Sequence, residues 1–394
     1  MLSSLALIFL CGMLLGGIFK RIGLPRLLGM LITGIVLGPN LLNLLDMNIL
    51  LVSADLRQLA LIIILTRAGL SLDVNDLKKV GRPAILMCFI PACFEIAGMV
   101  LLAPKLLNIS IVEAMVMGAV VAAVSPAVIV PKMLYLMENG YGKNKAIPQM
   151  IMAGASVDDV FVIVIFTAAV GLTQGENVLA LRILQIPASI IIGIMAGIII
   201  GGALHILFKK VRMRDSSKVI ILLSISFLLV AIEKISPAPF SGLLAVMSTG
   251  LAIQKKNTVV AARLSQKYSK LWIAAEVILF VLVGATVDLK YALASGVSAV
   301  IVILGALVFR MFGVFVCMIK TNISMKERMF CMIAYMPKAT VQAAIGSLPL
   351  SMGLSCGHIV LTVAVLAILI TAPLGAVGID LTYKRLLHHQ NANT

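Results

Sequence analysis

The segment AVVAAVSPAVIVP, residues 119–131, is an apolar run that Ser125 and Pro126 interrupt near its middle. Proline has no backbone N–H, so Pro126 is expected to break a helix at this point. A broken helix is tolerated at membrane depth only where protein covers it or where it lines a watery cavity. The segment therefore predicts a discontinuous membrane helix beside a functional cavity, the alternative being a simple proline kink.

A second segment has the same character. It is YMPKATVQAAIG, residues 335–346, in which Pro337 is followed by Lys338 and Thr340. Paired broken helices expose the partial charges of half-helix ends at mid-membrane, where a cation or a lysine can meet them. We expect Pro337 and Thr340 to mark this second break and Lys338 to compensate the negative end of a half-helix, with a direct role in transport as the alternative.

The composition places the whole chain in lipid. Hydrophobic residues make up 61% of the 394 residues, charged residues make up 12%, and the mean hydropathy is +1.13. A helix needs about 20 mostly apolar residues to cross a bilayer, and about thirteen runs meet this requirement. They lie near 2–19, 22–41, 50–70, 82–104, 110–135, 146–173, 179–208, 217–235, 238–254, 269–288, 293–318, 326–348 and 357–380. The sequence predicts an all-α polytopic membrane protein with about 13 transmembrane helices.

Basic residues gather in the loops on one side of the predicted spans. The formal net charge of +16 is therefore a topology signal and not a nucleic-acid footprint. The positive-inside rule places the N-terminus outside and the C-terminus in the cytoplasm, in a multi-pass protein of the bacterial inner membrane. The first apolar run begins at Leu2 without a basic leader, so we expect it to be a retained span.

The chain resembles itself at an offset of about 215 residues, which indicates an internal repeat. The matching positions are Thr33–Gly34 with Thr249–Gly250, Gly69-x-Ser71-x-Asp73 with Gly284-x-Thr286-x-Asp288, and Glu95 with Arg310. An odd number of predicted spans separates each pair, so the halves are expected to be inverted across the membrane. Within one transporter unit of residues 1–394 we expect a first repeat at 1–178, a linker helix at 179–208 and a second repeat at 209–394. Short matches also arise by chance in Gly- and Leu-rich sequence.

Two adjacent aspartates, Asp158 and Asp159, occur in the apolar run GASVDDVFVIVIF, residues 154–166. A carboxylate at the bilayer centre costs at least about 2.5 kcal/mol, so two of them need a reason. Neighbouring helix positions point about 100° apart, so one aspartate can face a cavity while the other faces a partner helix. We expect Asp159 to bind a small cation, or a proton when the cation leaves, with Asp158 assisting and with hydroxyl ligands from Ser156 and Ser125. The alternative is a structural pair neutralised by salt bridges.

Glu95 and Arg310 are also expected near mid-membrane, where a pair of opposite charges costs far less than either charge alone. They are expected to sit together, either as a static ion pair or with Arg310 also contacting Asp158 and tuning it. Arginine stays protonated, so Arg310 cannot carry the proton itself.

The sequence holds no glycine-rich phosphate loop, no Cys/His metal cluster and no nucleophile elbow. Each of these motifs would have indicated nucleotide binding, a metal centre or nucleophilic catalysis. We therefore expect no enzyme activity and no cofactor.

Four segments together carry a family resemblance. They are LPRLLGMLITGIVLGP (24–39), AVVAAVSPAVIVP (119–131), ENGYGKNKAIPQMIMAGASVDDVFVIVIFTA (138–168) and YMPKATVQAAIG (335–346). The chain resembles the cation:proton antiporter superfamily, in particular its NHA-type sodium/proton antiporters. The resemblance implies a homodimer with an NhaA-like fold of thirteen spans, crossed discontinuous helices and an elevator-type movement. It also implies that Asp159 carries cation and proton, that Asp158 assists, and that Glu95 and Arg310 match the acidic and arginine positions of the group.

Three functions fit the sequence to different degrees. The first is a secondary active antiporter that exchanges Na⁺ or Li⁺ for H⁺. The second is a Na⁺-coupled symporter of an organic anion, which would need more polar groups at mid-membrane than the sequence offers. The third is a cation channel or a membrane scaffold, and adjacent aspartates on one span do not resemble a selectivity ring. Many electrogenic members of the superfamily carry lysine where Arg310 stands, so the arginine favours electroneutral exchange or a stoichiometry set only by the aspartates. The stoichiometry stays open, because the segment ASVDD also lacks the Asn-Asp pairing of the electroneutral first branch.

Overall fold

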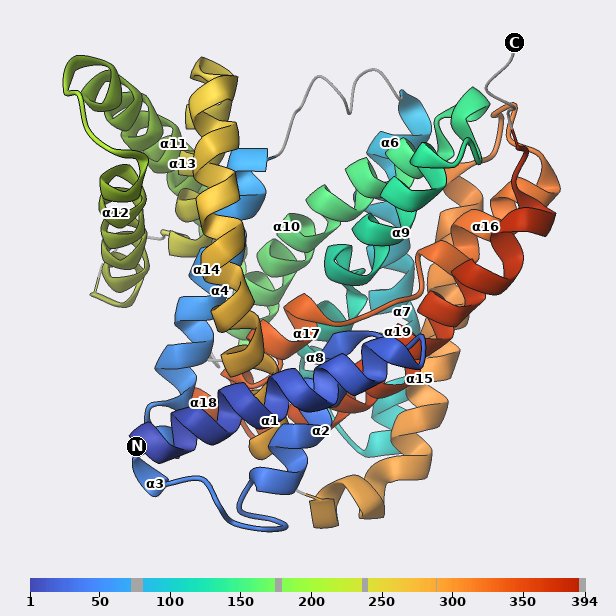
Figure 1. Cartoon of the computed structure of the whole chain (residues 1–394). Coiled ribbons are helices and arrows are strands. Elements are labelled where there is room, and N and C mark those ends of the chain that lie inside the picture. Colours follow the sequence, from blue (N-terminus) through green and yellow to red (C-terminus); the bar gives the residue numbers. More distant parts are fainter. Residues whose placement is uncertain (72–80, 174–178, 236–239, 288, 390–394) are drawn as a thin grey trace. The chain divides into compact units, whose positions relative to one another are not determined.

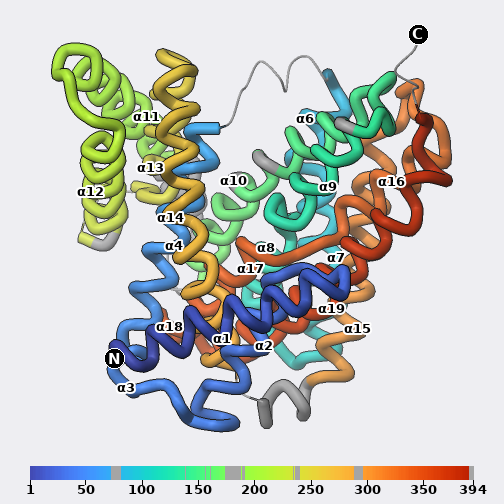
Figure 2. Tube along the Cα trace, in the orientation of Figure 1, coloured from blue at the N-terminus to red at the C-terminus, as the bar shows by residue number. Residues whose placement is uncertain are grey.

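The structure is a computed structural model that describes residues 1–71, 81–173, 179–235, 240–287 and 289–389 (Figures 1 and 2). Within these ranges the regular structure is helical, apart from one isolated bridge between Tyr141 and His389. This confirms the all-α class expected from the apolar runs. The side chain of Ser156, an expected cation ligand, lies outside the described part of the chain.

In the described ranges, nine helical stretches are long and apolar enough to cross a membrane. They are formed by α1 (Leu2–Arg21), α6 (Arg82–Met87) with α7 (Ile90–Leu107), α8 (Ile111–Ala122) with α9 (Pro126–Glu138), α10 (Ile147–Thr173), α11 (Leu179–Lys210), α12 (Asp215–Ile235), α14 (Thr258–Ala285), α15 (Leu289–Cys317) and α19 (Gly357–Leu386). The chain is therefore a polytopic helical membrane protein.

The four other expected spans correspond to shorter or less apolar helices. These are α2 (Arg26–Leu37), α3 (Met47–Leu51) with α4 (Ser53–Ser71), α13 (Gly242–Lys256), and α16 (Met325–Ala334) with α17 (Thr340–Ile345), followed by the single turn α18 (Leu348–Ser351). Each lies where the apolar pattern places a span, although none of them is by itself both long and apolar enough to count as a membrane-crossing helix. The count of thirteen stays a prediction.

In two of the spans that consist of more than one helix, the interruptions touch each other. The first falls between α8 and α9, and the second between α16 and α17. The Ser125 N–H donates to the Pro337 carbonyl oxygen at 2.8 Å, which joins the two interruptions through their backbones. The Gln342 amide donates to the carbonyl oxygens of Val121 and Ala123 at 3.0 and 2.8 Å. Backbone groups that the breaks leave without helical partners thus find partners across the break.

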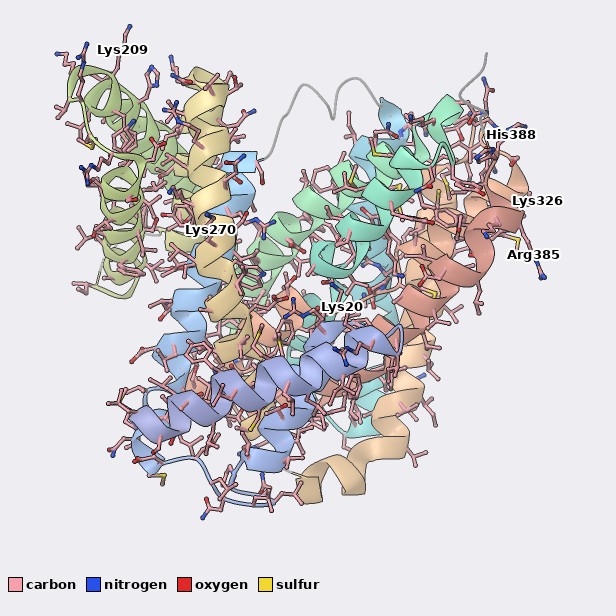
Figure 3. The ribbon with its side chains drawn as sticks, viewed as in Figure 1. Lys20, Lys209, Lys270, Lys326, Arg385 and His388 are labelled. Atoms are coloured by element: carbon pink, nitrogen blue, oxygen red, sulfur yellow. The ribbon has the colours of Figure 1, made fainter. Side chains whose placement is uncertain are left out.

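The contacts divide the chain into two compact units. One consists of Met1–Ala54, Asn75–Thr173 and Phe280–Thr394, and the other of Asp55–Val74 and Gln174–Leu279. Both interrupted spans and α10, which carries the paired aspartates, belong to the first unit. Figure 3 shows Lys326, Arg385 and His388 gathered at one end of this unit. Each unit contains segments from both halves of the sequence.

Glycines bring helices into backbone contact inside each unit. In the first unit α2 meets α14 through Gly34 and Gly284, and in the second unit α4 meets α13 through Gly69 and Gly250. A Cβ atom at any of these four positions would overlap the backbone of the facing helix. These are the glycines that align at the offset of about 215 residues, so the two contacts are equivalent under the predicted repeat.

Candidate functional site

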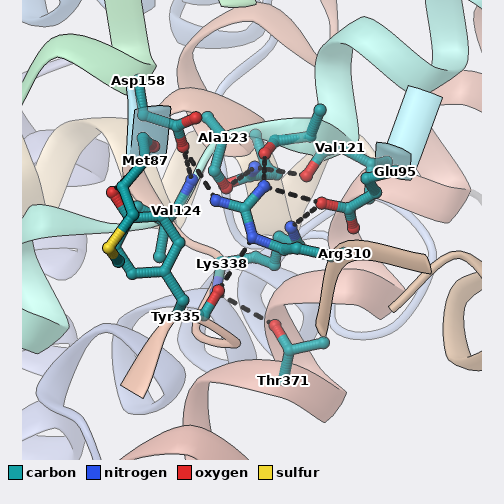
Figure 4. A network of polar contacts seen from close by, with 12 residues as sticks. Met87, Glu95, Val121, Ala123, Val124, Asp158, Arg310, Tyr335, Lys338 and Thr371 are labelled. Atoms are coloured by element: carbon teal, nitrogen blue, oxygen red, sulfur yellow. Dashed lines mark hydrogen bonds and ion pairs between the residues drawn. The ribbon is translucent and has the colours of Figure 1, made fainter. Parts of the chain in front are cut away.

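Arg310, on α15, lies at the centre of a buried network of polar groups (Figure 4). Its side chain is 1% exposed, and it donates to Asp158 Oδ2 and to Glu95 Oε2, each at 2.9 Å. It also donates from Nε to the Tyr335 carbonyl oxygen at 2.8 Å and from Nη1 to the Ala122 carbonyl oxygen. One guanidinium therefore links α7, α10 and the backbone at both interruptions, a role that suits its planar fork of five donors.

Lys338 is the second buried cation of the network, with a side chain that is 1% exposed. Its ammonium donates to Glu95 Oε2 at 2.5 Å, and its backbone N–H donates to Thr371 Oγ1 at 3.0 Å. The ammonium thus has a carboxylate partner that the sequence did not assign to it, while compensation of a half-helix end by Lys338 stays a prediction. Two cations and two carboxylates thus balance each other, which lowers the energy of burying all four charges.

Asp158 is held from two directions. Its Oδ2 atom accepts the Arg310 guanidinium and, at 2.8 Å, the backbone N–H of Val124 inside the first interruption. The side chain is fully buried. A carboxylate with a charged donor and a backbone donor on one oxygen is fixed in position, because charge-assisted hydrogen bonds are the strong ones.

Asp159 follows on α10, about 100° further around the helix. Its Oδ1 atom is buried and has no hydrogen-bond partner among the described residues. The same is true, within the described part of the chain, of Asp158 Oδ1, Ser125 Oγ, Thr340 Oγ1 and Gln342 Oε1. Carboxylate, hydroxyl and amide oxygens are the ligands that hard cations prefer. The residues around the interruptions therefore offer oxygen atoms suited to a small cation.

The structure brings together most of the residues that the sequence singles out. Glu95, Asp158, Arg310 and Lys338 form one network, while Ser125 and Pro337 join the interruptions. Pro126 is the first residue of α9, and Thr340 is the first residue of α17. No group of three or more His, Cys, Asp and Glu side chains converges in the described ranges. A cation bound here would thus take part of its ligands from hydroxyl, amide or carbonyl oxygens.

Sequence reasoning assigned no role to three contributors to the network. Gln342 was recognisable as a polar residue that follows Pro337 in an apolar span. Tyr335 contributes a carbonyl oxygen, and the centroid of its ring also lies 5.2 Å from the Arg310 guanidinium carbon. Thr371 contributes a hydroxyl from the distant helix α19. A backbone carbonyl and a single threonine carry no recognisable pattern, so these two contacts needed the structure.

Comparison with known proteins connects this geometry to a family. Residues 5–384 match the family described as "Sodium/hydrogen exchanger, transmembrane". The chain is 32% identical to sodium/hydrogen exchanger 9B2 of Homo sapiens, over 99% of this chain and 76% of that protein. It is 31% identical to sodium/hydrogen exchanger 9B1 of Homo sapiens, over 85% of this chain and 67% of that protein.

Among solved structures, the fold is similar to that of the sodium proton antiporter MjNhaP1 from Methanocaldococcus jannaschii. The TM-score is 0.84 at 18% identity, and the match covers 98% of each chain. At this identity the likeness shows a shared fold. With the family match over nearly the whole length, it follows that the chain belongs to the transmembrane sodium/hydrogen exchanger family.

Proposed function

We propose that the protein is a secondary active antiporter in which Na⁺ or Li⁺ and H⁺ compete for Asp159, with Asp158 assisting. One observation carries the proposal: adjacent aspartates on α10 differ in their partners. Oδ1 is buried without a hydrogen-bond partner in both aspartates of the described ranges, but Asp158 is also fixed through its Oδ2 atom by Arg310 and Val124. Asp158 is thus held in place by its protein partners, and we expect the Asp159 carboxylate to be the one that binds an ion.

Competition for one carboxylate is itself an exchange mechanism. Burial disfavours the charged form of a carboxylate that has no counter-ion, so Asp159 needs either a cation or a proton. Buried oxygens of Ser125 and Thr340 belong to the touching interruptions and are suited to complete a cation site, with Ser156 as a further hydroxyl. Arg310 stays protonated, so it contacts Asp158 without carrying a proton itself.

The antiporter reading extends to the architecture. We propose two inverted repeats, 1–178 and 209–394, joined by a linker at 179–208, with thirteen spans and crossed discontinuous helices. The equivalent glycine contacts support this, as do matching hydrogen bonds from Thr33 to the Gly29 carbonyl and from Thr249 to the Ala245 carbonyl, both 2.8 Å long. The division into two compact units is compatible with an elevator-type movement. In such a movement one unit carries the site, and the other forms the interface of a homodimer.

The same proposal includes a location. We propose the bacterial inner membrane, and the basic loops favour an orientation with the N-terminus outside and the C-terminus in the cytoplasm. The alternative of a Na⁺-coupled organic anion symporter is not favoured by the family. It also lacks support in the network, because Arg310 and Lys338, the cations that could bind an anion, are already paired with carboxylates.

Proton movement in sealed vesicles tests the function. The purified protein is reconstituted with a pH-sensitive dye inside, and Na⁺, Li⁺ or K⁺ is added without any other solute. We expect a cation-dependent pH change that Asp159→Asn abolishes. The matched control is Asp380→Asn, which removes a carboxylate that is 54% exposed and paired with Lys132 on the surface. A cation-independent signal, or full activity of Asp159→Asn, would refute the proposal.

A further inference from the structure

The first half of each interrupted span begins with the same capping motif. At the start of α8, Glu113 N–H donates to Ser110 Oγ at 3.2 Å and Ser110 N–H donates to Glu113 Oε2 at 2.8 Å. At the start of α16, Ser324 and Glu327 repeat this exchange at 3.4 and 2.7 Å. The motifs lie about 215 residues apart, so they are equivalent positions of the predicted repeat.

Each capping glutamate has a second partner on the loop that follows the other interrupted span. Glu113 Oε1 accepts from the Ser355 hydroxyl at 2.6 Å, and Ser355 lies between α18 and α19. Glu327 Oε2 accepts from the Lys145 ammonium at 2.7 Å, and Lys145 lies between α9 and α10. The two interrupted spans are therefore tied to each other a second time, away from the touching interruptions.

The two ties differ in strength. The contact between Lys145 and Glu327 is an ion pair in which the Glu327 side chain is 4% exposed and the Lys145 side chain is 31% exposed. The contact between Ser355 and Glu113 joins a neutral hydroxyl to a carboxylate, and Ser355 is exposed. Charge-assisted contacts to a buried oxygen are stronger than contacts at exposed groups, because water competes for the exposed groups. The Lys145–Glu327 pair is thus the firmer tie.

The Lys145–Glu327 pair joins the two elements that form the site. Lys145 ends a 3₁₀ turn (Lys143–Lys145), and two residues later α10 begins and carries Asp158. Glu327 is in the first turn of α16, and the residue after that helix, Tyr335, gives its carbonyl oxygen to Arg310. Arg310 thus connects α10 with the end of α16 at the site, while Lys145 and Glu327 connect them at the loop.

We propose that Lys145 and Glu327 are positioning residues for cation binding. The ion pair fixes the start of α10 against the start of α16 and so holds Asp159 in register with the touching interruptions. Loss of such a supporting contact can shift the ligands of the ion by a fraction of an ångström, which is enough to weaken an ion site. This inference rests on the proposed cation exchange at Asp159, although it concerns residues outside the site itself.

Three variants of one loop test the proposal. Lys145→Met removes the charge and keeps the length of the side chain, Lys145→Arg restores the charge, and Lys143→Met is the matched control on the exposed side of the same turn. The apparent KM for Na⁺ is measured in vesicles, and amide hydrogen exchange of Ser125 is measured in the purified protein. We expect Lys145→Met to raise the KM by about tenfold and to speed exchange at Ser125. Lys145→Arg and Lys143→Met should stay near wild type.

The two readouts separate this inference from the proposed function. An unchanged KM together with unchanged Ser125 exchange in Lys145→Met would overturn it, even if the melting temperature fell, because the pair would then be merely structural. If the wild type moved no protons with any cation, the proposed function would fail. Hydrogen exchange would still show whether the pair positions the interruptions.

Discussion

At the scale of single residues, Arg310 is the side chain that connects the other groups of the site. It serves two carboxylates and two backbone carbonyls with a side chain that is 1% exposed. Removing one partner of a buried ion pair leaves the other charge without compensation, which is costlier than the pair was worth. The network is therefore expected to respond to a change at Arg310 as a unit.

Arg310→Ala should lower the free energy of unfolding by about 3 to 5 kcal/mol, because Asp158 is left without its counter-ion. Thermal melting in detergent micelles measures the loss. Arg263→Ala is the comparison, since Arg263 pairs with Asp215 but is 51% exposed, and it should cost at most about 1 kcal/mol. Equal melting of the two variants would show that the network does not stabilise the protein.

The residue types allowed part of this site to be predicted. Charges inside apolar runs identified Glu95, Asp158, Asp159 and Arg310, and the ion pair expected between Glu95 and Arg310 is found at 2.9 Å. The contact of Lys338 with Glu95 was not predicted, because a sequence gives no distance between a lysine and a carboxylate on a remote span. The carbonyl ligands of Arg310 were also invisible, since every residue has a carbonyl oxygen.

At the scale of helices, the apolar runs located the elements better than their ends. The run near 269–288 corresponds to α14, which begins as early as Thr258. A helix needs apolar side chains only where lipid surrounds it. The hydropathy pattern therefore detects only the part of α14 that is expected inside the bilayer. The interruptions coincide with Pro126 and Pro337, and proline removes a helical donor. Proline alone does not decide a break, because Pro131 and Pro373 lie inside the helices α9 and α19.

Gly250→Ala tests the backbone contact of α13 with α4. A Cβ at this position would lie within 3.0 Å of backbone atoms of Thr66, Gly69 and Leu70, so the helices must move apart. We expect a loss of about 1 to 3 kcal/mol in thermal melting. Gly202→Ala on α11, where a Cβ would meet nothing within 4 Å, should be neutral or slightly stabilising. Wild-type stability of Gly250→Ala would remove this support for the repeat.

At the scale of the whole molecule, the proposed inverted repeat accounts for contacts between segments that are remote in the sequence. Glu95 and Arg310 align at the repeat offset and form an ion pair, as the two capping motifs align and form equivalent ties. Equivalent segments of inverted halves come together near the axis that relates them, at mid-membrane. The site is thus built from both halves of the chain.

The proposed topology can be tested with single cysteines in a variant that lacks the six native ones. Lys105→Cys should react with a membrane-impermeant maleimide in intact cells, because its loop is expected outside. Lys209→Cys should react only after permeabilisation, because the basic loops are expected in the cytoplasm. The reverse labelling pattern would invert the orientation and leave the fold unchanged.

The central claim is that a cation and a proton compete for Asp159, and calorimetric titration of the purified protein with Na⁺ at several pH values tests it most directly. Competition predicts that the Na⁺ affinity rises with pH, because fewer protons occupy the carboxylate. It also predicts that binding releases protons, seen as heats that depend on the buffer, and that Asp159→Asn binds no Na⁺. An affinity that is independent of pH, or Na⁺ binding by Asp159→Asn at wild-type strength, would contradict the account.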